Sequence, residues 1–221
     1  MNGGLWTPRP PRALVVFDVN VYLDVARLMV GNFSWDDFLK RASQHASDPN
    51  PHTLNAQIDS LRALAISLTG RYEPDCALEV WFGRHLDDTT FHKLTQAIEG
   101  GELPEDCGLG WSDDDANDFL DNFVTRIRKD NSGGFIEGEP VAYKSPPLDH
   151  EDGCVLATAN LAGTEDFSYE KFCVTRDRGF RTASLKTEIT VMYPHEWVAH
   201  MRSKLNQGNP LHRMMTAATT P

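Results

Sequence analysis

An apolar run that ends on a carboxylate constrains this chain more than any other feature. The residues from Ala13 to Phe17 read Ala-Leu-Val-Val-Phe, and Asp18 follows directly. Five consecutive apolar residues without alternation are typical of a strand buried on both faces, as in parallel sheets. In such sheets the carboxyl ends of the strands open onto the crevice where ligands bind. The run therefore predicts a core strand that carries Asp18 to a functional edge of an α/β fold.

Two later segments place further acids beside apolar elements. Asp149-His-Glu-Asp152 precedes the alanine-rich run Gly-Cys-Val-Leu-Ala-Thr-Ala, and Asp177 comes shortly after the apolar Phe-Cys-Val that ends at Val174. Hard divalent cations such as Mg²⁺ or Mn²⁺ require oxygen ligands, and clustered carboxylates repel one another without such a cation. If the three segments are neighbours in the sheet, Asp18, Asp152 and Asp177 form an acidic, metal-holding pocket.

Each acid also has a purely structural interpretation. Asp18 is a suitable N-cap for a following helix, and Asp149 and Asp152 suit the positive N-terminal end of another. Asp177 lies between two arginines and suits a surface turn. Taken singly, each acid favours the structural interpretation. The repetition of an acid beside an apolar element, three times along one chain, favours a functional site.

Hydrophobic periodicity predicts strands that alternate with helices along the chain. Strands are expected at about 13–17, 78–82, 172–175 and 189–192. Helices are expected at about 22–29, 35–46, 58–68, 87–97, 112–129, 150–161 and 194–205. This alternation indicates an α/β fold with a mainly parallel central sheet flanked by helices.

The length of 221 residues is sufficient for one domain with an insertion. Clustered prolines predict a flexible arm over 1–12, because proline excludes helix. A single domain is expected over 13–205, with a helical insertion at about 31–72. Small polar residues predict a loose tail over 206–221.

The composition excludes some classes of protein. The net charge of −11 argues against a protein that binds nucleic acid through its overall charge. Residues 181–221 nevertheless hold five bases against two acids, which allows a local basic surface. The four cysteines have no Cys-x-x-Cys spacing, so a zinc site or a disulfide framework is disfavoured and a reducing compartment is expected. No signal peptide and no run of about 20 apolar residues is present, which predicts a soluble, cytoplasmic protein without a membrane partner.

The acidic segments together resemble the PIN-domain ribonuclease family, an α/β fold of metal-dependent nucleases. Members of that family open with an apolar strand and Asp-x-Asn, as in Asp18-Val-Asn20. They carry a later Asp-x-x-Asp before an alanine-rich helix, as at 149–152, and close with a strand ending Val-Thr-x-Asp, as at 174–177. The motifs occur in the family's order near both ends of the domain, whereas the middle, about 31–147, is similar only in general layout.

The resemblance implies a PIN-like three-layer sandwich that hydrolyses RNA phosphodiester bonds. Asp18, Asp152 and Asp177 would hold Mg²⁺ or Mn²⁺, with Asp149 close by, and an activated water would attack phosphorus without a covalent intermediate. The side chains that would support the site or contact substrate are Asn20, Thr175, Arg176 and Arg178. The two arginines suit substrate phosphates, since guanidinium groups pair bidentately with them, but screening of the acidic surface is an equal alternative.

One acid of the family's set has no clear counterpart here. The family usually carries a further acid, commonly glutamate, near the start of the helix after the second strand. This chain reads Arg-His-Leu-Asp87-Asp88-Thr89 in that region, and Thr89 aligns with the acid. Asp88, one residue earlier, is the predicted catalytic substitute; Asp87 or no residue at all are the alternatives.

Two other functions compete with a nuclease. A haloacid-dehalogenase-like phosphatase needs a second aspartate two residues after the first to transfer a proton, and Asn20 cannot do so. The stronger alternative is a catalytically weak or inactive PIN-like module that binds nucleic acid or protein. Many bacterial members of the family are toxins blocked by a small antitoxin. RNA, an antitoxin protein and a second copy of the chain in a homodimer are therefore the candidate partners.

Overall fold

The computed structural model describes residues 11–29, 33–46, 55–98, 108–142, 148–165, 167–182 and 188–207. The predicted tail after residue 207 and the first ten residues of the predicted arm lie outside these ranges. The last two residues of that arm, Pro11 and Arg12, belong to the first strand. The strand therefore begins two residues earlier than predicted.

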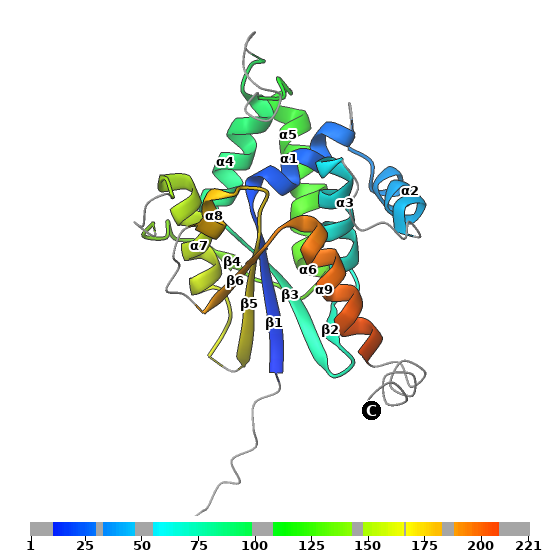
Figure 1. The fold of residues 1–221 in the computed structure, drawn as a ribbon. Helices are drawn as coiled ribbons and strands as arrows, with labels where there is room; N and C mark the ends of the chain where they lie inside the picture. The colour runs from blue at the N-terminus through cyan, green and yellow to red at the C-terminus, as the bar shows by residue number, and fades with distance from the viewer. Residues whose placement is uncertain are drawn as a thin grey trace, which may run out of the picture.

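A mostly parallel sheet forms the centre of the fold (Figure 1). Its strands lie in the order β2-β3-β1-β5-β6. Their bounds are β1 Pro11–Phe17, β2 Arg71–Glu73, β3 Cys76–Gly83, β5 Ser168–Val174 and β6 Ile189–Met192. β1 pairs in parallel with β3 and β5, and β5 with β6, whereas β2 is antiparallel to β3. The two-residue strand β4 (Phe135–Ile136) pairs with the end of β3. The predicted α/β fold with a mainly parallel sheet is confirmed.

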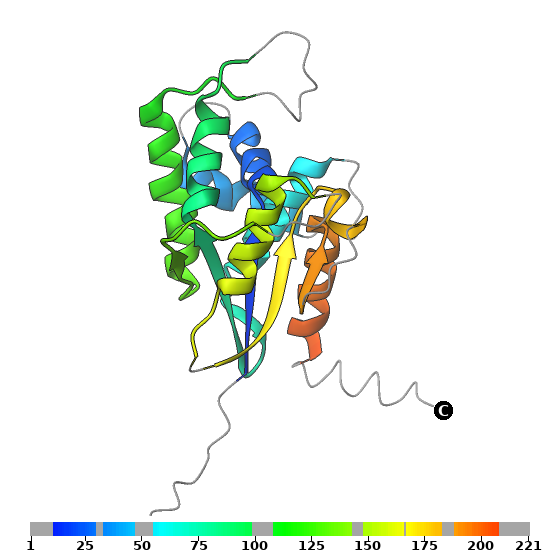
Figure 2. The same ribbon diagram turned by 90° about the vertical axis from the view of Figure 1, so that its left-hand side faces the viewer.

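Helices pack against this sheet (Figures 1 and 2). Their bounds are α1 Val19–Leu28, α2 Trp35–Ala46, α3 Ala56–Ser67, α4 Arg84–Thr95, α5 Asp113–Phe119, α6 Thr125–Asp130, α7 His150–Leu161, α8 Gly179–Thr182 and α9 Pro194–Gln207. A π-helical turn, Leu120–Val124, joins α5 to α6. Among the described residues, no helix is both long and apolar enough to cross a membrane.

The central strand β1 is buried on both of its faces. Phe17 of β1 and Phe172 of the paired strand β5 both contact Trp197 of α9, with ring centroids 6.5 Å and 5.1 Å from that of Trp197. On the opposite face, Leu14 approaches Gly163, which lies just beyond α7. Because successive side chains of a strand point to opposite faces, every residue of β1 from Ala13 onward meets a packed layer. This burial explains the unbroken apolar run.

Most element boundaries follow the predictions. The observed bounds of α2, α7 and β6 are those predicted, and other predicted strand and helix ends move by up to four residues. The helix predicted over 112–129 is instead interrupted by the π-helical turn. The short elements β2, β4 and α8 were not predicted. Such short elements depend on tertiary partners more than on local sequence.

The described part of the predicted insertion, 31–72, holds α2 and α3 and the start of β2. An aromatic cluster fixes α2 to the rest of the fold. Phe38 on α2 lies 4.8 Å from Phe123 in the π-helical turn, and Phe33 lies at the same distance from that ring. The insertion is thus packed into the domain rather than appended to it, because its aromatic rings share one core with the α5–α6 segment.

Candidate active site

Asp18 lies at the carboxyl end of β1 and caps α1. Its Oδ1 accepts a hydrogen bond from the backbone N–H of Val19 at 2.6 Å. Its Oδ2 accepts from the Thr175 hydroxyl at 2.6 Å and from the Asn20 amide at 2.5 Å. The side chain is buried, with 6% of the residue exposed. Asp18 is therefore both the helix cap of the structural interpretation and a fixed carboxylate at the strand edge.

Asn20 and Thr175 join the end of β1 to the loop that follows β5. The Thr175 hydroxyl accepts from the backbone N–H of Asp177 at 2.9 Å, and Asn20 Oδ1 accepts from the backbone N–H of Arg176 at 3.1 Å. The strand register supports the same approach, because the last residues of β1 and β5 are paired directly. These bonds fix the backbone of Asp177 beside Asp18 although the two are distant in sequence.

Asp149 and Asp152 lie at the start of α7. Asp149 caps the helix, and its Oδ1 accepts from the backbone N–H of Asp152 at 2.9 Å. Burial, followed by repulsion from Asp149, Asp177, Asp18 and Glu151, raises the pKa of Asp152 from its ordinary 3.8 to about 7. Like charges this close to one another disfavour simultaneous ionisation. The structure thus brings Asp18, Asp152, Asp177 and Asp149 together in one electrostatic cluster, here called the acidic cluster.

The electrostatics of Asp18 are dominated by burial. Burial raises the pKa of Asp18 to about 6, while the hydrogen bonds from Thr175 and Val19 lower it and the charge of Asp177 raises it. A carboxylate that accepts several hydrogen bonds is normally easy to ionise, so the net rise shows how strongly desolvation opposes the charge here. A nearby cation would relieve that cost.

The donor set of the acidic cluster has the chemistry that suits Mg²⁺ or Mn²⁺, since it offers carboxylate oxygens and no thiolate. Over the described ranges, however, no three His, Cys, Asp or Glu side chains lie close enough together to hold a metal ion. Binding would therefore require the carboxylates to come closer than they lie here.

Asp88, the predicted fourth acid, is paired within its own helix. It is exposed and pairs with Arg84 one helical turn earlier, at 3.3 Å. Burial is the largest cause that raises the pKa of the neighbouring Asp87. The charges of Asp88 and of Asp121 in the π-helical turn raise it further, whereas Arg84 and Arg128 lower it. Neither acid is among the groups with the largest effects on the pKa of Asp18 or of Asp152.

His85 occupies the start of α4 next to α7, a position that the sequence did not assign to the site. Its ring lies 6.0 Å from that of His150, and its Nε2 is buried with no hydrogen-bond partner within the described structure. α4 begins three residues earlier than predicted, at Arg84, because β3 continues to Gly83. A prediction that began the helix directly after Gly83 would have placed His85 in its first turn.

The two predicted substrate arginines differ in their surroundings. Arg176 donates to Asp24 at 2.6 Å, and Asp24, which is fully buried, also accepts from Ser60 at 2.6 Å. Arg176 therefore compensates a buried carboxylate and holds the loop after β5 against α1 and α3. Arg178 is exposed and lines a separate hollow beside Asp177.

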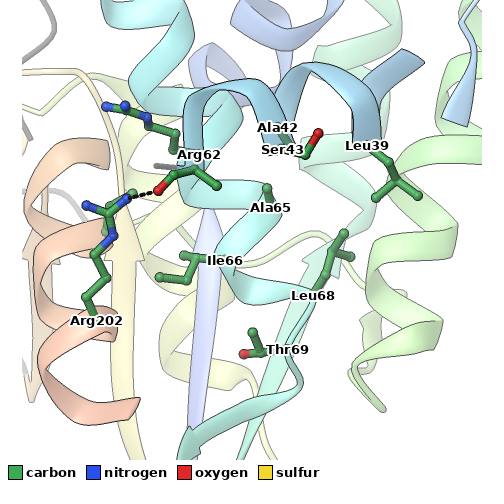
Figure 3. Close-up of a pocket in the computed structure, with 11 residues that line it drawn as sticks. Leu39, Ala42, Ser43, Arg62, Ala65, Ile66, Leu68, Thr69 and Arg202 are labelled. Carbon is green, nitrogen blue, oxygen red and sulfur yellow. Dashed lines mark hydrogen bonds between the residues drawn. The ribbon is translucent and has the colours of Figure 1, made fainter. Parts of the chain in front are cut away.

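A larger, mostly apolar hollow of about 450 Å³ lies between α2, α3 and α9 (Figure 3). Leu39, Ala65 and Ile66 contribute apolar side chains to it, and Arg202 donates to the carbonyl of Ala46 at 3.1 Å across its edge. No carboxylate of the acidic cluster lines this hollow. It is therefore not part of the candidate site.

Replacing Asp152 with asparagine should stabilise the metal-free protein at high pH. The pKa of Asp152 is about 7 in the folded protein and 3.8 in the unfolded chain. As far as this carboxyl group is concerned, the folded protein is therefore most stable below pH 3.8 and loses stability as the pH rises from 3.8 through about 7. Because Asp152 is only half-buried, solvent screens part of this effect. The charge of Asp152 then lowers the free energy of unfolding by about 1 kcal/mol at pH 8, which corresponds to roughly 2–4 °C in Tm. Thermal unfolding in EDTA should show that gain for Asp152→Asn at pH 8, roughly a third of it at pH 5 and almost none at about pH 3. An equal Tm for both proteins at pH 8 would contradict the repulsion described above.

Comparison of the chain with protein-family models, with curated proteins and with solved structures finds no match.

Proposed function

We propose that this protein is a PIN-like, metal-dependent endoribonuclease, with its sheet and helices arranged as a three-layer sandwich. One observation carries the proposal: the hydrogen-bonded group of Asp18, Asn20, Thr175 and the backbone of Asp177, which joins two parallel strand ends. Strand ends of this kind are where α/β folds bind ligands. The same four residues carry the first and last motifs of the family resemblance.

Asp18, Asp152 and Asp177 would hold Mg²⁺ or Mn²⁺, with Asp149 beside them. Bound there, the cation would neutralise phosphate charge and lower the pKa of the attacking water. Asp18 is held in one orientation by its three hydrogen-bond donors, so its oxygens need no rearrangement at the moment of reaction. Water forms the new bond to phosphorus, the bond to the leaving oxygen breaks, and the protein itself forms no covalent bond to substrate.

A second candidate is a PIN-like module that binds nucleic acid or protein with weak or no catalysis. Two observations favour it: Asp88 is exposed and pairs with Arg84, and the described residues contain no preassembled group of three metal ligands. The role of a toxin blocked by an antitoxin, the homodimer and the cytoplasmic location remain predictions from sequence.

Cleavage of a fluorescent single-stranded RNA separates the two candidates. The nuclease proposal predicts cleavage with Mg²⁺ or Mn²⁺, no cleavage in EDTA, and loss of on the order of 100-fold or more with Asp152→Asn. Because the same substitution should raise Tm, lost activity could not be attributed to unfolding. Equal activity of Asp152→Asn and wild type, or activity that survives EDTA, would refute the proposal, and metal-independent RNA binding without cleavage would support the binding module.

A further inference from the structure

The apolar hollow between α2, α3 and α9 has the size of a binding site for a small molecule. Its volume of about 450 Å³ lies within the roughly 300–1,000 Å³ of sites that enclose whole ligands, and spaces between packed helices are among the places where such sites occur. We call it the three-helix hollow. The residues that define it here are Leu39, Arg62, Ala65, Ile66, Leu68 and Arg202.

One end of the three-helix hollow is apolar. Leu39 of α2 and Leu68, which follows α3, lie at this end, and Ala65 lies between them and the opposite end (Figure 3). Leu39 is 41% exposed although its side chain is large and apolar. A ligand with an apolar body that covers these side chains would remove their surface from water, which is favourable.

Two arginines lie at the opposite end of the hollow (Figure 3). The Nε and Nη2 atoms of Arg62 donate to the carbonyl of His45 at 2.9 Å and 2.7 Å. Nη2 of Arg202 donates to the carbonyl of Ala46 at 3.1 Å. These two carbonyls belong to the last two residues of α2, so both guanidinium groups are anchored at the same place. The hollow therefore has a charged end and an apolar end.

The two arginines differ in how far their charge is already balanced. The side chain of Arg62 is buried, and its Nη1 lies 3.9 Å from an oxygen of Asp59. Arg202 is half-buried, and among the described residues its hydrogen-bond partner is the carbonyl of Ala46, with no carboxylate paired to it. A guanidinium group carries five N–H donors, so a single bond to a carbonyl leaves donors for a ligand. No acid lines the hollow, although the chain has a net charge of −11.

A carboxylate is the group that suits the charged end. A guanidinium group binds a carboxylate in one plane through two parallel hydrogen bonds. A phosphate monoester carries a charge of about −1.5 to −2, which exceeds the single charge of Arg202. A cation would be repelled by both arginines. A neutral apolar molecule would fill the hollow but would give Arg202 no new partner.

We propose that the three-helix hollow binds a small carboxylic acid with an apolar body, of the class of short- and medium-chain fatty acids. The carboxylate binds Arg202, and the apolar body covers Leu39, Ala65 and Leu68. No carboxylate of the acidic cluster lines the hollow, so this site and the candidate active site are separate. The proposal does not depend on the nuclease proposal.

Isothermal titration calorimetry of the full chain with three matched probes tests the site. Octanoate, 1-octanol and octylammonium have the same apolar body and differ in the charge of the head group. Octanoate should bind about tenfold more tightly than 1-octanol, and octylammonium should bind more weakly than either. Arg202→Gln should weaken octanoate binding about tenfold and leave the affinity for 1-octanol unchanged, because it removes only the partner of the anion.

Two further variants serve as controls. Ala65→Trp places a large ring in the three-helix hollow and should abolish the binding of octanoate and of 1-octanol alike. Arg84→Gln removes the same charge as Arg202→Gln, but from an exposed position on α4, and should leave all affinities unchanged. Circular dichroism of each variant establishes that the helices are intact.

Three results would overturn the proposal. The first is no binding of octanoate by the wild type, and the second is equal affinity of the wild type for octanoate and 1-octanol. The third is an unchanged affinity of folded Arg202→Gln for octanoate. Binding by a chain that ends at Gln207, but not by the full chain, would show that residues 208–221 occupy the hollow, and would overturn the proposal equally.

Discussion

Asp18→Asn should reduce metal-dependent RNA cleavage on the order of 1,000-fold, the largest catalytic effect expected in this chain. Asp18 is the best-fixed member of the acidic cluster, with one oxygen bound by the backbone of Val19 and the other by Thr175 and Asn20. Asparagine has nearly the same shape but no negative charge, so it removes the attraction for a divalent cation. Single-turnover cleavage with Mn²⁺ would measure the loss.

Substitutions around Asp18 should give smaller, graded losses. Thr175→Val and Asn20→Ala remove hydrogen bonds that orient Asp18 but no candidate ligand, so about 10–100-fold is expected from each. Asp88→Asn should leave the rate unchanged, because Asp88 pairs with Arg84 on the exposed side of α4. Circular dichroism would confirm folding of each variant. Activity of Asp18→Asn near that of the wild type would contradict the assignment of Asp18. A large loss with Asp88→Asn would show that Asp88 takes part in catalysis, as the family resemblance predicts.

The backbone elements were predictable where local sequence alone determines them. The bounds of α2 and α7 follow from apolar periodicity and from acids at their first turns, and β6 is a short β-branched run. The register of β1 against β5 has no such local signal. It pairs Phe17 with Val174 through contacts between segments more than 150 residues apart, and that pairing is what places Asp18 near Asp177.

The fourth acid shows why the site was only partly predictable. The sequence predicted a helix that begins at about Asp87, three residues late, and so placed Asp88 in its first turn. α4 starts at Arg84, and His85 rather than Asp88 lies beside His150 of α7. The pairing of Arg176 with Asp24 could not be predicted from the sequence either, because it depends on how α1 and the loop after β5 pack in space.

Trp197→Ala should produce the largest loss of stability, about 3–5 kcal/mol, because it empties the space between α9 and the sheet. Trp197 is fully buried, and its ring contacts Phe17 of β1 and Phe172 of β5. Its Nε1 donates to the Ser67 hydroxyl of α3 at 3.0 Å, so one side chain connects α9, α3 and two strands. Urea unfolding followed by circular dichroism would measure the change in the free energy of unfolding.

Trp197→Phe separates packing from hydrogen bonding at the same position. Phenylalanine keeps an aromatic ring against Phe17 and Phe172 but loses the donor to Ser67, whose own hydroxyl still donates to the carbonyl of Ala63. Because Ser67 keeps that bond, the cost should be only about 1–2 kcal/mol, part of it from the smaller ring. Equal losses for Trp197→Phe and Trp197→Ala would mean that the hydrogen bond to α3, not the filled space under the sheet, holds α9 in place.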